Sequence, residues 1–461
     1  MASHILTRWD PEDPVFWEKQ GREIANRNLW ISIPSLSLAF AVWMVWSVVV
    51  VNLPNAGFSF TTEELFWLSA LPALCGATLR SFYSFMVPIF GGRRWTAIST
   101  VSLLLPTLGM AFAVRDPSTG YPTFVILALL CGFGGGNFAS SMANINFFFP
   151  KVQKGTALGL NAGLGNLGVS LAQFVVPLVI TAGMFGSLGG EPQIWMRGAE
   201  AKQMWLQNAG LIWVPFIAIF ALAAWFGMHD LATAKAPFSD QIGTLKSKHN
   251  WIMCWLYLGT FGSFIGYSAG FPLLIKSQFP QVDALTYAWL GPLMGALIRP
   301  LGGWLSDRLG GAKVTFWNFI AMAAGVIGVL AFLPHDGQGG NFYGFLAMFM
   351  LLFLTAGIGN GSTFRMIPVI FLNQRQREAA GRGRQAEEQA IGEANREAAT
   401  VLGFASAIGA YGGFFIPMGY GTSISMTGGP AAALYGFIVF YVTCIAMTWW
   451  YYLQRSAEMP C

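Results

Sequence analysis

The chain has 461 residues, of which 54% are hydrophobic and only 10% are charged, and its formal net charge is +5. Because ordinary soluble domains carry about 25% charged residues, this composition excludes a soluble globular protein. The five cysteines include no Cys-x-x-Cys pair, so neither a disulfide framework nor a metal site is expected. The small net charge gives no reason to expect a nucleic-acid partner.

Apolar runs long enough to cross a bilayer as helices recur along the whole chain. A spanning helix needs about 20 mainly apolar residues. The residues before the first run have mixed charge and no small-residue cleavage site, so no cleavable signal peptide is expected. The sequence predicts an all-α integral membrane protein with twelve transmembrane helices, at about 30–52, 64–90, 96–114, 121–149, 156–183, 208–227, 251–275, 285–305, 314–333, 343–371, 398–421 and 431–453.

The polar segments between these runs divide the chain into five parts. With a cytoplasmic N-terminus, most of the 26 Lys and Arg residues fall in cytoplasmic segments, and only Arg115, Arg197, Lys202 and Lys276 fall in segments on the other side. This asymmetry follows the positive-inside rule and predicts that both termini are cytoplasmic. The parts are a cytoplasmic N-terminal segment 1–29, a six-helix half 30–227, a cytoplasmic linker 228–250, a second six-helix half 251–453 and a cytoplasmic tail 454–461.

The second and eighth runs each contain one arginine in similar surroundings. Gly76-Ala77-Thr78-Leu79-Arg80 resembles Gly295-Ala296-Leu297-Ile298-Arg299, and a Gly-Gly pair follows each arginine. An arginine at membrane depth costs about 2.5–3.5 kcal/mol, so we infer that both charges are used. Snorkelling to the interface is the alternative, but each arginine lies roughly 15 Å from its Gly-Gly pair, near the middle of the membrane.

We interpret the two arginines as facing each other across a pore and binding a small anion. Two guanidinium groups about 8 Å apart would repel by about 2 kcal/mol at an effective dielectric constant near 20. A bound monoanion would relieve this repulsion and accept charge-assisted hydrogen bonds. An empty site would then resist closure, which favours obligatory exchange of one anion for another.

Glycine patterns that lie six runs apart indicate that the two halves are repeats. The fourth and tenth runs share Gly-x-Gly-x-Gly, starting at Gly132 and Gly357. The fifth and eleventh runs share Thr-x-Leu-Gly-x5-Gly-x-x-Gly, starting at Thr156 and Thr400. Parallel repeats of six helices are typical of two-halved transporters, whose site lies at the midplane between the halves. Close helix packing is the alternative role of these glycines.

The ionisable residues limit the chemistry that the spans can perform. No acid, histidine or lysine lies well inside a predicted span; Glu63, Glu64 and Glu397 lie at the edges. Proton-coupled carriers usually keep such a residue in the membrane, and arginine stays protonated. Proton coupling through the core is therefore disfavoured, whereas coupling through an edge residue or through water stays open. Without an intramembrane acid–base pair or metal-ligand set, neither an enzyme nor a cofactor is expected.

For several residues within the spans, the sequence is compatible with two different roles. Asn166 could bind an anion or join two helices, and Phe138, Tyr257 and Phe261 could enclose a flat ligand or simply pack. Arg365 could line an inner vestibule or hold a structural position at the interface.

Five motifs resemble the nitrate/nitrite porters (NarK-type) of the major facilitator superfamily, and the similarity extends over nearly the whole chain from Trp9-Asp10-Pro11-Glu12-Asp13-Pro14 onward. Two of them resemble the nitrate signatures of that family, and one resembles the superfamily's loop motif. The signature-like motifs are Ala162-Gly163-Leu164-Gly165-Asn166-Leu167-Gly168 and Gly403-Phe404-Ala405-Ser406-Ala407-Ile408-Gly409-Ala410-Tyr411-Gly412-Gly413-Phe414-Phe415; the loop motif is Gly303-Trp304-Leu305-Ser306-Asp307-Arg308-Leu309-Gly310-Gly311; the others are Ser84-Phe85-Met86-Val87-Pro88-Ile89-Phe90-Gly91-Gly92-Arg93-Arg94 and Asn137-Phe138-Ala139-Ser140-Ser141-Met142-Ala143-Asn144.

The resemblance implies a major facilitator fold of two pseudo-symmetric six-helix halves with nitrate and nitrite as substrates. It also implies a rocking motion in which the signature helices bend at glycines and the loop motif acts in gating. The implied substrate-binding residues are Arg80, Arg299, Asn166, Tyr257, Phe138, Phe261 and Ser406; the implied bending glycines are Gly163, Gly165, Gly168, Gly409 and Gly412; the implied loop-motif residues are Asp307 and Arg308.

Two positions depart from the family pattern. Pro88 stands in the first half where Asp307 stands in the second half, and Arg365 stands where an uncharged residue such as glutamine is expected.

The leading hypothesis is nitrate/nitrite exchange by alternating access across the bacterial inner membrane, serving anaerobic respiration or nitrate assimilation. One-for-one exchange moves no net charge, so the membrane potential would not oppose it. We expect a multi-pass protein that works as a monomer in the lipid bilayer. Nitrate–proton symport on the same scaffold is the first alternative, and a passive anion channel is the second.

Overall fold

The computed structural model describes residues 4–197, 200–232, 246–334 and 339–461. By its internal contacts the chain divides into two compact units. Unit 1 comprises Met1–Ala236 and Ser268–Leu293, and unit 2 comprises Pro237–Tyr267 and Met294–Cys461. Residues 1–3 of the predicted N-terminal segment and residues 233–245 of the predicted linker lie outside the described residues.

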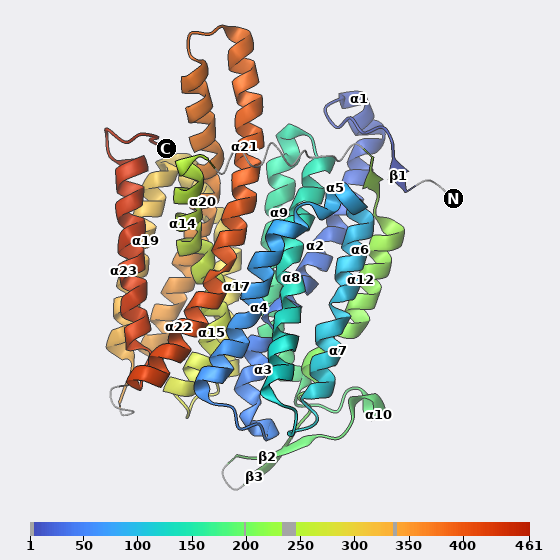
Figure 1. The fold of residues 1–461 in the computed structure, drawn as a ribbon, viewed down its shortest axis with the longest axis vertical. Coiled ribbons are helices and arrows are strands. Elements are labelled where there is room, and N and C mark those ends of the chain that lie inside the picture. The colour runs from blue at the N-terminus through green and yellow to red at the C-terminus, as the bar shows by residue number, and fades with distance from the viewer. Residues whose placement is uncertain (1–3, 198–199, 233–245, 335–338) are drawn as a thin grey trace. The chain divides into compact units, whose positions relative to one another are not determined.

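Unit 1 is a bundle of helices with two short pairs of strands (Figure 1). β1 (Ile5–Leu6) pairs in parallel with β4 (Asp230–Leu231), and β2 (Gln193–Arg197) pairs antiparallel with β3 (Glu200–Met204). The helices are α1 (Pro14–Phe16), η1 (Trp17–Gly21), α2 (Arg22–Met44), α3 (Trp46–Asn52), η2 (Pro54–Ala56), α4 (Thr62–Tyr83), α5 (Met86–Phe90), α6 (Gly92–Ser102), α7 (Leu104–Ala113), α8 (Tyr121–Phe148), α9 (Lys151–Val179), α10 (Gly186–Gly189), α11 (Asn208–Leu211) and α12 (Trp213–Gly227).

Unit 2 is mainly helical in its described residues, and two helices are divided between the two units. These two are α15 (Ser263–Gln278) and α17 (Leu290–Leu297), with α16 (Ala284–Ala288) between them. The other helices are α14 (Lys248–Tyr257), η3 (Leu258–Gly262), α18 (Arg299–Leu309), α19 (Gly311–Phe332), α20 (Phe342–Ala379), α21 (Arg384–Ala410), α22 (Gly412–Thr427), α23 (Ala431–Thr448) and η4 (Trp449–Leu453).

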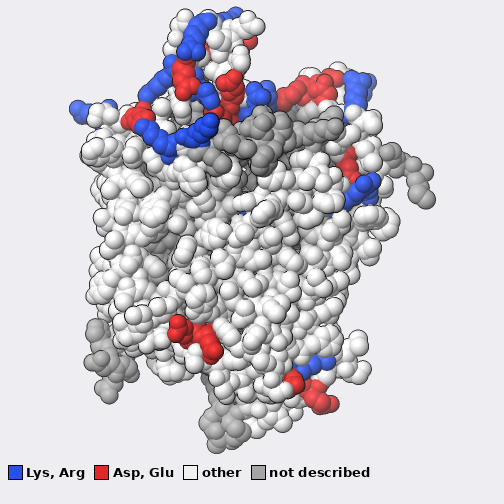
Figure 2. Space-filling model, viewed as in Figure 1, with Lys and Arg blue, Asp and Glu red and all other residues white. Residues whose placement is uncertain are grey.

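Eleven helices among the described residues are long and apolar enough to cross a membrane. The remaining predicted run, 285–305, consists of α16, α17 and α18 in succession, and α18 begins at Arg299. Counted with this interrupted segment, the chain has the twelve membrane segments that the sequence predicts. On the face shown in Figure 2, charged side chains lie at the ends of the helices and the area between them is nearly free of charge.

The first long helix begins earlier than the apolar pattern predicts. A helical stretch runs from Pro14 to Asn52, whereas the predicted span begins near residue 30. The local sequence explains this start, because the Asp13 side chain accepts a hydrogen bond from the backbone N–H of Val15, and proline is favoured in the first turn. The apolar pattern places the start of the span near residue 30 because polar residues precede the apolar run.

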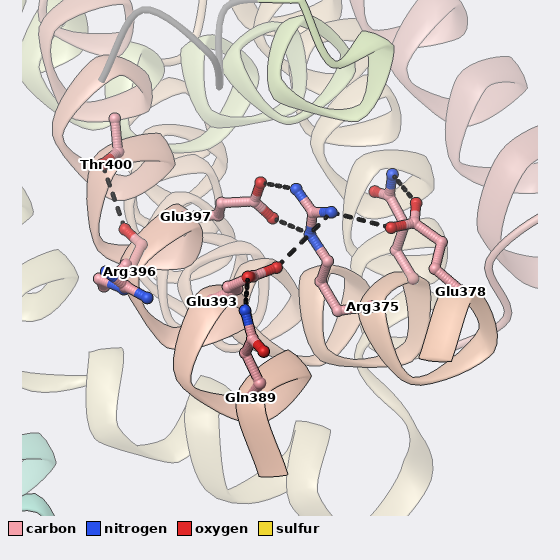
Figure 3. Close-up of polar contacts among 8 residues, drawn as sticks. Arg375, Glu378, Gln389, Glu393, Arg396, Glu397 and Thr400 are labelled. Atoms are coloured by element: carbon pink, nitrogen blue, oxygen red, sulfur yellow. Dashed lines mark hydrogen bonds and ion pairs between the residues drawn. The ribbon is translucent and has the colours of Figure 1, made fainter. Parts of the chain in front are cut away.

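The polar segment 372–396 is an extension of two helices. α20 and α21 continue past the apolar residues and form a hairpin that projects from unit 2 (Figure 1). Arg375 of α20 joins them (Figure 3). Its guanidinium group donates to both carboxylate oxygens of Glu397, with Nε 2.9 Å from Oε2, and its Nη1 lies 2.9 Å from Glu378 and 3.9 Å from Glu393. Several charges of this segment therefore form one network.

Glycines of the first signature-like motif let α9 approach α2. A Cβ atom at Gly168 would overlap the backbone oxygen of Ser37, and one at Gly165 would lie 2.6 Å from Leu36. A Cβ atom at Gly163 would meet nothing within 4 Å. Close approach therefore requires glycine at 165 and 168, but not at 163.

Replacing Gly168 by alanine should destabilise the protein by about 1–3 kcal/mol, because the obstructing atom belongs to the backbone and cannot rotate away. The matched control is Gly163→Ala, which adds the same methyl group to the same helix in open space. Thermal unfolding of the two purified variants should show a lower midpoint for Gly168→Ala alone. Equal midpoints would contradict the packing role of Gly168.

Candidate functional site

Arg80 lies near the end of α4, and it is only 1% exposed. Its Nε donates to the backbone oxygen of Gly135 on α8, at 3.0 Å. Its guanidinium carbon lies 4.7 Å from the ring centroid of Phe138, 5.3 Å from that of Trp43 and 6.0 Å from that of Phe40. The charge is therefore placed against the electron-rich faces of aromatic rings and beside a neutral oxygen.

Small residues make this arrangement possible. A Cβ atom at Gly76 would lie 3.1 Å from the Cα atom of Gly135, so the α4 and α8 backbones are in contact. The indole Nε1 of Trp43 donates to the backbone oxygen of Pro72 at 2.8 Å, which fixes this ring beside Arg80. Glycines thus bring a backbone carbonyl within reach of a buried arginine.

Arg299 occupies the corresponding place in unit 2. The side-chain amide of Asn360 has one orientation in which both its oxygen and its nitrogen form hydrogen bonds. In this orientation the oxygen accepts from Nε of Arg299 at 3.0 Å and also from Nη2. The Asn360 nitrogen donates to the hydroxyl of Tyr257 at 3.0 Å. The guanidinium carbon of Arg299 lies 5.4 Å from the ring centroid of Phe261 and 5.2 Å from that of Phe264.

The two arginine clusters are built from equivalent positions of the repeat. Phe261 and Phe264 follow Phe40 and Trp43 by 221 positions in both cases. Asn360 follows Gly135 by 225 positions, which is also the spacing of the Gly-x-Gly-x-Gly motifs. Each arginine therefore contacts two aromatic residues of the first helix in its half and a neutral oxygen of the fourth. The difference is that this oxygen is a backbone carbonyl in unit 1 and a side-chain amide in unit 2.

The structure brings most of the predicted substrate-binding residues into these clusters. Phe138 contacts Arg80, while Tyr257 and Phe261 belong to the Arg299 cluster and lie 5.5 Å apart by ring centroid. Ser406 is buried, and its hydroxyl donates to the backbone oxygen of Gly403 at 2.9 Å.

Asn166 is fully buried in α9. Its Nδ2 donates to the oxygen of Ala162 at 2.5 Å, and its Oδ1 has no hydrogen-bond partner among the described residues. One N–H of this amide is thus used within its own helix, and binding of an anion by Asn166 stays a prediction.

The two signature-like segments differ in their helical continuity. α9 runs without interruption through the first, whereas in the second α21 ends at Ala410 and α22 begins at Gly412. A Cβ atom at Gly409 would lie 2.8 Å from Tyr257, and one at Gly412 would overlap Gly262. These two glycines allow close packing against the π-helical turn η3 and its neighbour, and bending at them stays a prediction.

The loop-motif residue Asp307 forms an ion pair with Arg365. Arg365 Nε lies 2.5 Å from Asp307 Oδ1, and the two side chains are 49% and 53% exposed. The guanidinium carbon of Arg308 lies 4.2 Å from the ring centroid of Trp304. The two departures from the family pattern, Pro88 and Arg365, therefore concern the same interaction. Arg365 pairs with Asp307, and Pro88 replaces the equivalent aspartate in the first half.

Sequence analysis did not identify Phe40, Trp43, Phe264 or Asn360. The repeat of the two halves could have identified them. Its spacing makes Phe40 equivalent to Phe261, and the glycine pattern of the fourth run makes Gly135 equivalent to Asn360. Among the described residues there is no group of three or more His, Cys, Asp or Glu side chains that could hold a metal ion.

The family model of the Major Facilitator Superfamily matches residues 35–383. The chain belongs to the Major Facilitator Superfamily. It is 53% identical over 458 residues to the nitrate/nitrite transporter NarU of Escherichia coli, covering 99% of this chain and 97% of NarU. It is also 41% identical to the probable nitrate/nitrite antiporter NarK2 of Thermus thermophilus, covering 99% and 98% of the two chains.

Solved structures of this superfamily have the same fold. A D-xylose–proton symporter matches with a TM-score of 0.64 at 16% identity, covering 95% of this chain and 98% of that chain. At this identity the likeness shows the fold alone. Membership of the superfamily identifies the chain as a multi-pass membrane transporter rather than an enzyme.

Replacing Asn360 by alanine should lower transport roughly 10- to 100-fold. Hydrogen bonds to charged groups contribute about 1.5–3 kcal/mol, and this change removes a neutral partner of Arg299 and a hydrogen-bond partner of Tyr257. Asn318→Ala is the control, because Asn318 is a similarly buried amide of unit 2 whose Nδ2 faces the sulfur of Met322. Initial uptake rates normalised to folded protein would test this, and equal loss in both variants would contradict a specific role of Asn360.

Proposed function

We propose that this transporter exchanges nitrate for nitrite by alternating access. The observation that carries the proposal is the pair of similarly built clusters around Arg80 and Arg299, in a chain 53% identical to a nitrate/nitrite transporter. Both arginines bind the same anion during the cycle. The other proposed substrate-binding residues are Asn166, Tyr257, Phe138, Phe261 and Ser406.

The surroundings of the arginines favour a small planar monoanion. A guanidinium group presents donors in one plane and can bind two oxygens of a flat anion at once. The aromatic rings beside each guanidinium exclude water, and this strengthens the hydrogen bonds to a desolvated ligand. Nitrate and nitrite are flat and weakly basic, whereas a tetrahedral anion would not lie flat between rings.

Exchange, rather than uptake of nitrate alone, is supported by the charges near the arginines. The hydrogen-bond acceptors of Arg80 and Arg299 described above are both uncharged. A bound monoanion compensates part of the positive charge, so the loaded transporter changes conformation more readily than the empty one. Nitrate import would then be balanced by nitrite export, in support of anaerobic respiration or nitrate assimilation.

We propose that the protein lies in the bacterial inner membrane with both termini in the cytoplasm and works as a monomer. The asymmetric distribution of Lys and Arg supports this orientation. One chain contains both arginine clusters, so a second copy is not needed to complete the set of binding residues.

Arg80→Lys and Arg299→Lys should each reduce nitrate exchange at least 100-fold. Lysine keeps the charge, but it loses the planar donors and the stacking on aromatic rings. Arg115→Lys is the control, because Arg115 is a half-buried arginine outside the predicted spans, and its Nη2 donates to the backbone oxygen of Leu188. Uptake of labelled nitrate into nitrite-loaded proteoliposomes measures all three, and wild-type rates in either of the first two variants would refute the binding role.

The same proteoliposomes distinguish exchange from its alternatives. Uptake only into vesicles loaded with nitrate or nitrite, and independent of a pH gradient, is the result expected for exchange. Uptake into empty vesicles driven by an inward proton gradient would establish symport. Conductance far above the turnover of a carrier would establish a channel.

A further inference from the structure

A small cavity lies within unit 1, between α2, α6 and α8, and it shares no residue with the Arg80 cluster. Eight of its nine lining residues are polar, and none of the nine is charged. The centre of a water molecule has about 10 Å³ in which to move there, which is room for one water. We propose that this cavity is a binding site for one structural water molecule that joins the three helices.

The polar lining comes mainly from one face of α6 and one face of α8. Thr96, Ser99 and Thr100 follow one another at the three- and four-residue spacing that places side chains on the same face of a helix. Ser99 is 4% exposed and Thr100 is 1% exposed. Buried polar groups cost free energy unless they are hydrogen-bonded, so the partners of these groups must be accounted for one by one.

Most of the lining hydroxyl groups use their hydrogen within their own helix. Five of them donate to backbone oxygens three or four positions earlier, at distances of 2.7–3.3 Å. These five are Ser35, Thr96, Ser99, Thr100 and Ser140. A hydroxyl group that has donated its hydrogen still has lone pairs that can accept. The cavity is therefore rich in hydrogen-bond acceptors.

A pair of serines adds one donor to this lining. The hydroxyl oxygens of Ser32 and Ser141 lie 2.8 Å apart, and that of Ser141 also accepts from Nδ2 of Asn161 at 2.8 Å. The contact between the two serines uses one of their two hydroxyl hydrogens. The other hydrogen is a donor to which the oxygen of a water can bind.

Asn137 provides the group that most needs a partner. It lines the cavity and is 6% exposed, and its Oδ1 has no hydrogen-bond partner among the described residues. An amide oxygen buried without a hydrogen bond is costly, and a water donating to it removes that cost. Its second hydrogen can then bond to one of the hydroxyl oxygens of α6.

The chemistry of the lining selects water over an ion. Several acceptors and one donor match the two donors and two acceptors of a water molecule. An anion would find a single hydroxyl donor and no cationic side chain. A metal ion would find no carboxylate, and the next residue after Asn137, Phe138, already contacts the positive charge of Arg80.

The site lies behind the part of α8 that contacts Arg80. Gly135 and Phe138 are three residues apart and face Arg80, whereas Asn137, Ser140 and Ser141 occupy a different face of the same helix. A water bound there links that second face of α8 to α2 and α6. It therefore stabilises the position of the helix that supplies the partners of Arg80.

Radiolytic footprinting of the full-length protein in lipid nanodiscs tests the proposal, because hydroxyl radicals formed from a bound water modify the side chain beside it. Leu36 lines the cavity and is 1% exposed, whereas Leu38 of the same helix is 4% exposed and does not line it. We expect hydroxylation of Leu36 to be severalfold faster than that of Leu38. Equal or slower modification of Leu36 would overturn the proposal.

A pair of nearly isosteric substitutions provides a second test. Thr100 and Thr107 are both buried, and each donates its hydroxyl hydrogen to a backbone oxygen four positions earlier, at 2.7 Å and 2.8 Å. Only Thr100 lines the cavity, so Thr100→Val loses a bond to the water in addition, and it should lower the thermal unfolding midpoint more than Thr107→Val does. Equal midpoints, or a lower one for Thr107→Val, would contradict the water site. Neither test involves the transported anion, so both are independent of the proposed exchange.

Discussion

The structure depends on placing guanidinium groups inside helices that cross a membrane. A charge there is tolerated only with compensation, and each unit provides it with aromatic ring faces and a neutral oxygen. This requirement explains the small residues nearby, because the Gly135 carbonyl can reach Arg80 only where the α4 and α8 backbones touch. Both of these oxygen partners are neutral, in keeping with the proposed binding of an anion.

The two halves meet the same requirement in different ways. Unit 1 uses a backbone oxygen beside Arg80, and unit 2 uses the Asn360 amide, which also bonds to Tyr257. A side chain can rotate, whereas a carbonyl within a helix cannot. The charged residues beside the Gly-Gly pairs also differ, since Arg93 and Asp230 form a buried pair in unit 1 and Asp307 and Arg365 form an exposed one in unit 2. Both comparisons concern the partners of an arginine, and in both of them the two units use different groups.

The sequence predicted the membrane segments because their apolar runs are long, and it identified both arginines because a charge in such a run is conspicuous. It could not predict that the first helix starts at Pro14 or that the α20–α21 hairpin is joined through Arg375, since polar helices are stabilised by caps and pairs rather than by apolar periodicity. Asn360 and Trp43 were missed because a single amide or indole in a membrane helix has many roles. Pairing Arg365 with Asp307 required knowing which faces of α18 and α20 meet.

The central claim is that Arg80 and Arg299 bind one anion together, and calorimetric titration of nitrate into the purified protein tests it most directly. The account predicts one nitrate per chain in wild type and loss of measurable binding in both Arg80→Gln and Arg299→Gln. Two nitrate sites in wild type, with each variant keeping one of them, would mean that the arginines act separately and would contradict the account.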